Sequence, residues 1–240
     1  VINPQYMIDL MSCLVSVQNN FIIDGKLYHS DVEKIWKNYD KSLHQWIVKV
    51  TEKFDLTFSL PDQNINLVPC LMNETPSNNI DWITYEDNNN KEILKKETKI
   101  LYQFDYLPSG LFNRAQVRLF QITDNKLIWR YGSLLKKNNH LALVTRNDNT
   151  IKVKARGIQP ENLIFLIHEV IENLIAESFN GVVFDFSFPC PDCYENSIID
   201  AQRSMISASI VRRATMLKAV FLQCRNYFHV IPLIELHSRM

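Results

Sequence analysis

Residues 107–119 read LPSGLFNRAQVRL, and this stretch decides how the second half of the chain folds. Its Pro-Ser-Gly run interrupts the preceding segment, because proline and glycine are typical of turns. A helix is predicted to follow. Its inward-facing apolar residues recur at helical spacing: Leu111, Phe112, Ala115 and Leu119. The stretch therefore predicts a junction at which a strand gives way to a helix.

The segments on either side of this helix alternate as strands do. Ile100, Tyr102 and Phe104 alternate with three other residues, which predicts a strand ending near Asp105. Three further strands are predicted downstream, at about 126–136, 140–146 and 150–156. The asparagine-containing turns between them are short, and connections this short require antiparallel neighbours.

The rest of the second half continues the alternation of helices and strands. Pro160 opens a long helix, and Gly181 lies at or just beyond its end. Another strand is predicted from apolar residues at every second position, which are Val182, Phe184, Phe186 and Phe188. A further helix is expected over about 198–219 and an extended segment over about 227–236. This order predicts helices packed on an antiparallel sheet.

The first half changes from helical to alternating periodicity. Helices are predicted to begin at Asn3-Pro4, at Ser30 and near Leu43, each with an apolar stripe. A hairpin is predicted from residues 56–60 and 65–67. Three helices followed by a hairpin is a winged-helix-like order.

We therefore expect an α+β fold with two subdomains. A winged-helix-like helical subdomain is assigned to residues 1–76, and an antiparallel-sheet subdomain packed with helices to residues 97–240. The stretch 77–96 between them is polar and contains Asn88-Asn89-Asn90, which is typical of a loop or linker.

Composition excludes several classes of protein. Hydrophobic residues make up 46% of the 240 residues, and 26 Lys and Arg balance 26 Asp and Glu. These values argue against disorder, and a balanced charge gives no global attraction to nucleic acid or an anionic membrane. Five cysteines are too few for a disulfide scaffold, so we expect reduced thiols and a cytoplasmic location. We expect no signal peptide and no membrane-spanning run, and the start at Val1 suggests a piece of a longer protein.

No complete catalytic motif is present in the sequence. The five glycines are scattered, so neither a phosphate-binding loop nor a dinucleotide fingerprint can form. His168-Glu169 lacks the second histidine of a metalloprotease helix, and the chain has no nucleophile elbow. We expect no catalytic residue and no nucleotide site in this segment.

DNA binding is an alternative, because winged helices often place their third helix in the major groove. Residues 1–60, however, hold six lysines against seven carboxylates. Lys49 and Lys53 on the third helix are accompanied by Glu52. A DNA-binding face must neutralise phosphates. The charges therefore favour a surface for protein contacts, and no nucleic-acid partner is expected.

A structural zinc site is the second alternative. Cys190 and Cys193 form a C-x-x-C pair, and Cys224 and His229 add two later ligands of the zinc type. The spacing of the later pair departs from the commoner patterns. A reduced cysteine pair in a proline-rich turn is the simpler interpretation, and we expect no cofactor in this segment.

Several ordered motifs resemble the COR domain, which follows the Ras-like GTPase domain of Roco proteins such as the leucine-rich repeat kinases. The most specific motif is the stretch 107–119, which is similar to the family's h-P-x-G-h-h-x-R element. Supporting motifs occur in the family order: Asn3–Met7, Gly25–Leu27, Asp31–Lys34, Val50–Phe54, Leu67–Pro69 and Trp129–Gly132.

The resemblance implies a non-catalytic module that packs on a Ras-like GTPase domain of the same chain and dimerises with a second copy. It would couple the nucleotide state to a kinase domain, so the parent would be a GTP-binding serine/threonine kinase. It implies Tyr102, Tyr106 and Phe112 as contacts with the GTPase domain, although aromatic residues at strand spacing are more often core. Arg114 and Arg118 are expected to tie the helix to carbonyls or carboxylates.

Overall fold

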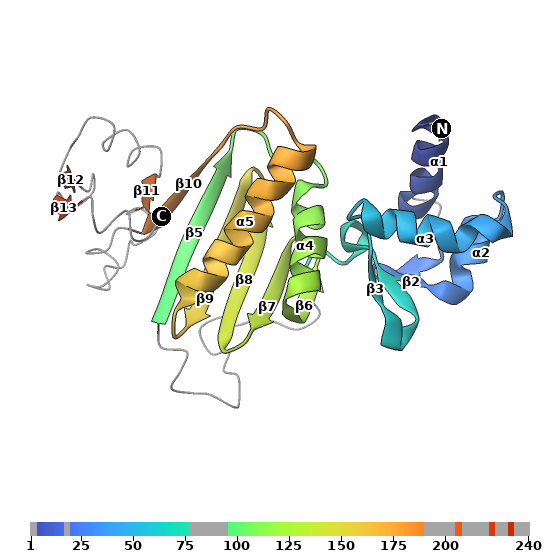
Figure 1. Cartoon of the computed structure of the whole chain (residues 1–240), viewed down its shortest axis with the longest axis horizontal. Helices are drawn as coiled ribbons and strands as arrows, with labels where there is room; N and C mark the ends of the chain where they lie inside the picture. The colour runs from blue at the N-terminus through green and yellow to red at the C-terminus, as the bar shows by residue number, and fades with distance from the viewer. Residues whose placement is uncertain are drawn as a thin grey trace.

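The structure is a computed structural model that describes residues 4–16, 20–76 and 96–189, and three short strands at 205–207, 221–223 and 230–232. Helices and antiparallel sheets build two subdomains that lie side by side (Figure 1). The predicted α+β class is confirmed.

The first subdomain packs three helices on a small sheet. The helices are α1 (Pro4–Val15), α2 (Val32–Ile35) and α3 (His44–Lys53). The strands, all antiparallel, follow the order β1 (Ile22–Ile23), β2 (Lys26–Tyr28), β4 (Ile65–Leu67) and β3 (Phe58–Leu60). Single 3-10 turns connect them at His29–Asp31, Lys41–Leu43, Pro61–Gln63 and Pro69–Leu71. The predicted hairpin is β3–β4, and the sequence patterns do not predict β1 and β2.

The second helix is shorter than the sequence predicts. Its apolar stripe from Ser30 to Tyr39 suggested three turns, but α2 ends at Ile35, and the backbone of Trp36 leaves the helical region. The Trp36 ring is fully buried, and its indole N–H donates to the carbonyl of Leu10 at 2.9 Å. Tertiary packing of this ring therefore overrides the local periodicity.

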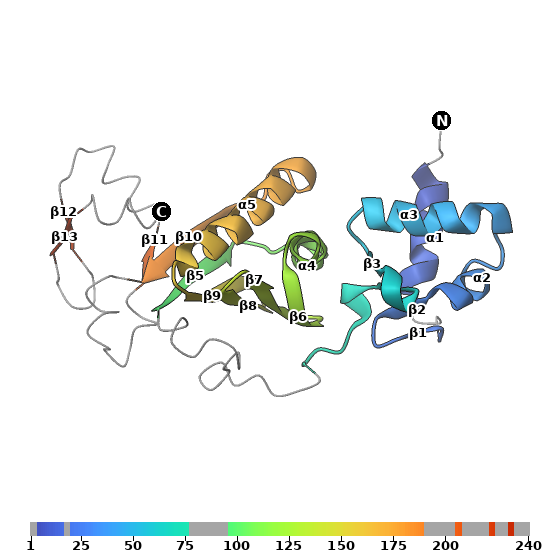
Figure 2. The same ribbon diagram turned by 60° about the horizontal axis from the view of Figure 1, so that its bottom comes forward.

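The second subdomain is a seven-stranded antiparallel sheet with two helices on one face (Figure 2). Its helices are α4 (Leu111–Ile122) and α5 (Pro160–Ser178). Its strands, in sheet order, are β11 (Met205–Ser207), β10 (Phe184–Pro189), β5 (Lys96–Phe104), β9 (Thr150–Gly157), β8 (His140–Asn147), β7 (Gly132–Lys137) and β6 (Asp124–Trp129). A separate pair joins β12 (Phe221–Gln223) to β13 (Val230–Pro232).

The main core lies between this sheet and its helices. Alternate residues of β5, β8 and β9 meet the inner faces of α4 and α5, and Phe186 and Phe188 of β10 close the cluster. The inward-facing residues predicted for α4, which include Leu111 and Ala115, are buried there. Burial of this apolar stripe is what fixes α4 and α5 on the sheet.

Two predicted elements are wrong. Residues 126–136 are not one strand but the hairpin β6–β7, which turns at Arg130-Tyr131. A Cβ at Gly132 would collide with the Trp129 ring, so the turn needs glycine there. The helix predicted over 198–219 is contradicted at Met205–Ser207, which pairs with β10 as a strand. The remaining residues of that range lie outside the described part of the chain.

Candidate functional site

Helix α4 is the element that joins the two subdomains. In both views of the fold it lies on the side of the second subdomain that faces α3 and β3 (Figures 1 and 2). One side of α4 packs on the sheet of its own subdomain through Leu111, Phe112 and Leu119. Arg114 and Arg118, one turn apart on another side, face the first subdomain. We call the contact region around them the joint.

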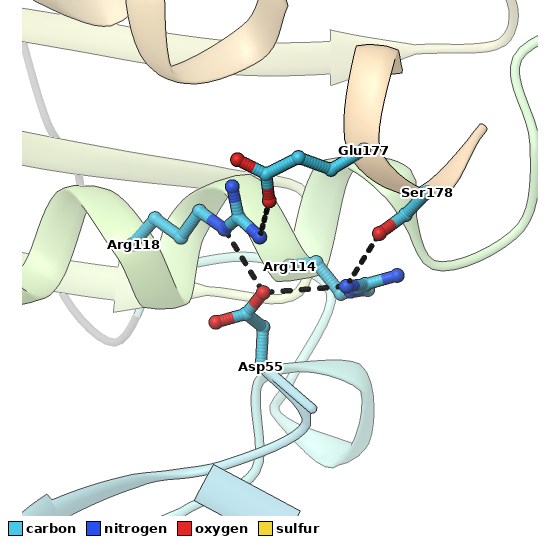
Figure 3. Close-up of polar contacts among 5 residues, drawn as sticks. All are labelled: Asp55, Arg114, Arg118, Glu177 and Ser178. Carbon is cyan, nitrogen blue, oxygen red and sulfur yellow. Dashed lines mark hydrogen bonds and ion pairs between the residues drawn. The ribbon is translucent and has the colours of Figure 1, made fainter. Parts of the chain in front are cut away.

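A cluster of charges forms the polar half of the joint (Figure 3). One carboxylate oxygen of Asp55 accepts hydrogen bonds from Arg118 Nε at 2.9 Å and from Arg114 Nη2 at 3.3 Å. Arg118 Nη2 also donates to Glu177 at 2.8 Å, and Arg114 Nη2 donates to the Ser178 hydroxyl at 3.1 Å. The two arginines therefore link the end of α3 to the C-terminal turn of α5.

The backbone presents Asp55 to the arginines in an unusual conformation. Its φ of 55° lies in the left-handed region, which aspartate tolerates better than most residues. This turn directs the chain from α3 into β3 and leaves Asp55 only 9% exposed. A carboxylate with so little contact with water needs charged donors, and the two guanidinium groups provide them.

Two groups of the cluster, Arg118 and Glu177, have shifted pKa values. Burial lowers the pKa of Arg118, but hydrogen bonds and charge from Glu177 and Asp55 outweigh this effect and raise it above its usual value. The pKa of Glu177 is lowered, first by the hydrogen bond from Arg118 and then by its positive charge. Both groups are therefore held in their charged forms at neutral pH.

Apolar packing forms the other half of the joint. The rings of Phe58 on β3 and Phe120 on α4 stack with centroids 3.8 Å apart. Val117 of α4 is fully buried in the same cluster, together with Ile65 and Leu67 of β4. These side chains belong to both subdomains, so their burial stabilises the joint without any specific charge.

A third contact closes the far end of the joint. The Arg130 amide donates to the carbonyl of Asn73 at 2.8 Å, and its guanidinium pairs with Glu74 at 3.0 Å. Asn113 of α4 donates to the Arg130 carbonyl at 3.0 Å, and Gln116 donates to the carbonyl of Trp129 at 2.9 Å. The β6–β7 turn is thereby fixed to α4 and to residues 73–74 at the end of the first subdomain.

Comparisons with protein families assign both halves. The family model for the C-terminal of Roc, COR-A domain matches residues 1–72, and the model for the C-terminal of Roc, COR-B domain matches residues 95–238. The chain belongs to the COR family. The resemblance inferred from the sequence motifs is confirmed, and the joint lies between a COR-A and a COR-B unit.

Curated relatives of this COR domain include Roco proteins of Dictyostelium discoideum. Probable serine/threonine-protein kinase roco11 is 34% identical over 149 residues, 56% of this chain and 10% of that protein. Probable serine/threonine-protein kinase qkgA is 31% identical over 69% of the chain and 11% of its own length. Pats1, another probable kinase, is 24% identical over 95% of the chain and 7% of its own length. The chain thus spans about a tenth of these relatives.

The three aromatic residues predicted to contact a GTPase domain lie in different surroundings. Tyr102 and Phe112 are 0% and 2% exposed and pack within the COR-B core, as the core interpretation of such aromatics expects. Tyr102 shares a hydrogen bond of 2.9 Å with His168 Nδ1, and burial raises the pKa of its phenol. In this conformation neither ring can contact another domain directly.

Tyr106 differs because 68% of its surface is exposed. Its loop is nevertheless well fixed: the Asp105 amide donates to the Val183 carbonyl, and Asn149 bonds both Asp105 and Leu107. Val183 is itself 61% exposed. Of the three predicted contacts, Tyr106 is the one that offers a surface to a partner.

The candidate zinc ligands Cys190, Cys193, Cys224 and His229 all lie outside the described residues, so the zinc site stays a prediction. Within the described ranges, no group of three or more His, Cys, Asp or Glu side chains is placed to hold a metal ion. The helices of those same ranges include none that is long and apolar enough to cross a bilayer.

The sequence predicts a structural role for Arg114 and Arg118, as ties from the helix to carbonyls or carboxylates of the sheet. Their partners are instead the carboxylates of Asp55 in the first subdomain and Glu177 on α5, and the sequence patterns do not predict Asp55. Asp55 lies 59 and 63 positions away from them, and its local sequence carries no motif of its own. The one usable signal is that α4 carries two arginines one turn apart, which require an acidic partner.

Proposed function

We propose that this chain is the regulatory and dimerising COR module of a larger Roco protein. In this proposal it packs on a Ras-like GTPase domain of the same protein, joins two copies, and couples the nucleotide state to a kinase domain. The kinase is proposed because the relatives are named as probable serine/threonine kinases. The chain itself supplies contact surfaces and no catalytic group.

The observation that supports this function best is the shared packing of α4. A regulatory module must transmit a change at one surface to another, and it can do so only if its contacts differ between two states. Helix α4 contacts the COR-A unit through Asp55 and Phe58, and the COR-B sheet through its opposite side. A shift of α4 would therefore alter both units together.

The exposed aromatic surface at Tyr106 is the proposed site of contact with the GTPase domain. Tyr106 lies five residues before Leu111, the first residue of α4. A partner bound at Tyr106 and Val183 would press on the loop from which α4 starts. Tyrosine is favoured at interfaces because its ring is large and rigid and its hydroxyl tolerates water.

The proposed surface for a second copy is the outer face of α5. Phe165 on this helix is 57% exposed, and Ile158 just before it is 59% exposed. Exposed large apolar side chains are candidates for contacts with another protein. Support for self-association itself comes from the family resemblance.

One experiment tests the module as a whole. A protein that contains this chain and the GTPase domain next to it is compared, with GDP and with a non-hydrolysable GTP analogue, by light scattering over a concentration series. We expect self-association that depends on the nucleotide and that Phe165→Glu weakens. A strict monomer in both nucleotide states would refute the dimerising role, and an unchanged equilibrium would refute the coupling.

A further inference from the structure

Ser178, the last residue of α5, contributes a hydroxyl group to the charge cluster of the joint (Figure 3). Its Oγ accepts a hydrogen bond from Arg114 Nη2 at 3.1 Å. The same nitrogen donates to Asp55 at 3.3 Å, so the hydroxyl and the carboxylate share one donor. A phosphate attached to Ser178 would therefore find a guanidinium group already beside it, and such pairs form strong hydrogen bonds.

The position of Ser178 suits the access of a protein kinase. The residue is exposed, and the chain turns directly after it at Asn180-Gly181, where the glycine has a φ of 88°. Helix ends fray more readily than helix interiors. The last turn of α5 can therefore open locally and present the hydroxyl to an enzyme without unfolding the COR-B core.

The charges of the cluster are balanced before any modification. The guanidinium groups of Arg114 and Arg118 face the carboxylates of Asp55 and Glu177. A phosphate on Ser178 adds a charge of about −1.5 to −2 at neutral pH. Two cations would then face three anions, and the weakest of the existing contacts should be lost.

The contact between Arg114 and Asp55 is the weakest of these. Its 3.3 Å is the longest distance in the cluster, whereas Arg118 bonds Asp55 at 2.9 Å and Glu177 at 2.8 Å. Long hydrogen bonds are weak. A phosphate offers three oxygens to the same guanidinium, and arginine can bind two of them in parallel. The phosphate would also repel the Asp55 carboxylate, because both anions would contact one nitrogen.

We propose that Ser178 is a phosphorylation site, and that its phosphate loosens the joint by taking Arg114 from Asp55. A separate serine/threonine kinase active site catalyses the transfer. The Ser178 oxygen bonds to the γ-phosphorus of a nucleoside triphosphate, and the bond from that phosphorus to the bridging oxygen breaks. The hydroxyl proton passes to water, and the nucleoside diphosphate leaves.

This inference goes beyond the proposed function. Its effect is on the contact between the COR-A and COR-B units, so it does not depend on whether the chain dimerises or binds a GTPase domain. The experiments below measure that contact alone. Their failure would leave the proposed function standing.

Mass spectrometry of the full-length protein, isolated from its source with phosphatases inhibited, tests whether the site is used. We expect a phosphorylated peptide in which the phosphate lies on Ser178. Recovery of this peptide in the unmodified form only would overturn the assignment of the site.

Hydrogen exchange of the 240-residue chain with Ser178→phosphoserine tests the effect on the joint. Exchange in β3 and α4 should become about tenfold faster or more, while exchange in β8 and β9 should change less than about twofold. The matched control is Ser42→phosphoserine, which adds the same charge at an exposed position of the COR-A unit outside the joint. The control should leave exchange in β3 and α4 within about twofold of the unmodified chain.

The variant Asp55→Asn separates this mechanism from general damage to the end of α5. It removes the carboxylate that competes for Arg114, so Ser178→phosphoserine should accelerate exchange less than about threefold in that background. Equal acceleration in both backgrounds would overturn the proposal. Acceleration by Ser42→phosphoserine to the same extent, or unchanged or slower exchange with Ser178→phosphoserine, would also overturn it.

Discussion

Replacing Asp55 by asparagine tests the joint most directly. Asparagine keeps the size of the side chain and also tolerates the left-handed backbone, so the change removes only the charge. Arg114 and Arg118 would then share one neutral acceptor. Because Arg118 keeps Glu177 as a partner, the cluster would be weakened rather than emptied.

The burial of the cluster sets the size of the effect. The side chains of Arg114 and Arg118 are 21% and 23% exposed, and that of Asp55 is 12% exposed. Breaking a fully buried pair costs about 3–5 kcal/mol, and breaking a surface pair costs about 1 kcal/mol or less. The joint lies between these limits. We therefore expect Asp55→Asn to lower the free energy of unfolding by about 2 kcal/mol.

Urea unfolding measures this loss, and hydrogen exchange locates it. The midpoint should fall by roughly 1 M for a slope near 2 kcal/mol/M, with faster exchange in α4 and β3 than in β8 and β9. Asp62→Asn is the matched control, because Asp62 is exposed in the same COR-A unit. A double-mutant cycle with Arg118→Gln should give a coupling energy of about 1–2 kcal/mol. If Asp55→Asn behaved like Asp62→Asn and showed no coupling, the joint would not depend on these charges.

Four further predictions concern single positions. Tyr106→Ala should weaken binding to the GTPase domain at least about tenfold while leaving the urea midpoint almost unchanged; an unaltered affinity in a pull-down titration would remove Tyr106 from the interface. Tyr102→Phe should cost about 1 kcal/mol in urea unfolding, because His168 loses a buried partner, and a neutral result would mean that this hydrogen bond adds no stability. Gly132→Ala should lower the free energy of unfolding by about 2–3 kcal/mol, since a Cβ there collides with the Trp129 ring. Gly181→Ala should lower it by about 1 kcal/mol, because only the left-handed φ opposes a side chain there. Equal shifts of the melting temperature for the two variants would contradict this ranking. Because the pKa of Glu177 is lowered in the folded state, its ionised form stabilises the fold above pH 4.5, the usual carboxyl pKa, and this contribution is lost as the pH falls through the lowered value. Glu177→Gln should flatten this part of the curve of stability against pH. An identical curve would show that the ion pair is not linked to folding.

Local patterns were enough to predict the elements with long apolar stripes. The helix at Leu111, the helix at Pro160 and the strands β8 and β9 are long, so their periodicity is clear. The turn between β8 and β9 is short, so the two strands must pair antiparallel. These elements make up most of the COR-B core, which is why the fold class followed from the sequence.

The features that the sequence does not predict depend on a missing turn signal or on contacts between residues far apart in the chain. The sequence predicts one strand in place of the β6–β7 hairpin, because the Arg130-Tyr131 turn lacks the usual asparagine-glycine signal. Its glycine comes after the turn, at Gly132. The helix from Ser30 was cut short by the burial of Trp36 under α1. The joint depends on Asp55 and on arginines some 60 positions later. A local sequence pattern carries no information about contacts between residues so far apart in the chain.

The position of α4 limits how these proteins can vary. Few positions of α4 can be substituted independently, because the helix packs on both units. A new residue at 117 or 120 must fit against β3 and β4, and one at 112 or 119 must fit against the COR-B sheet. COR-A and COR-B units from different Roco proteins should therefore not be interchangeable at the linker. A working hybrid would have to carry Asp55, the Phe58 strand and α4 from a single parent.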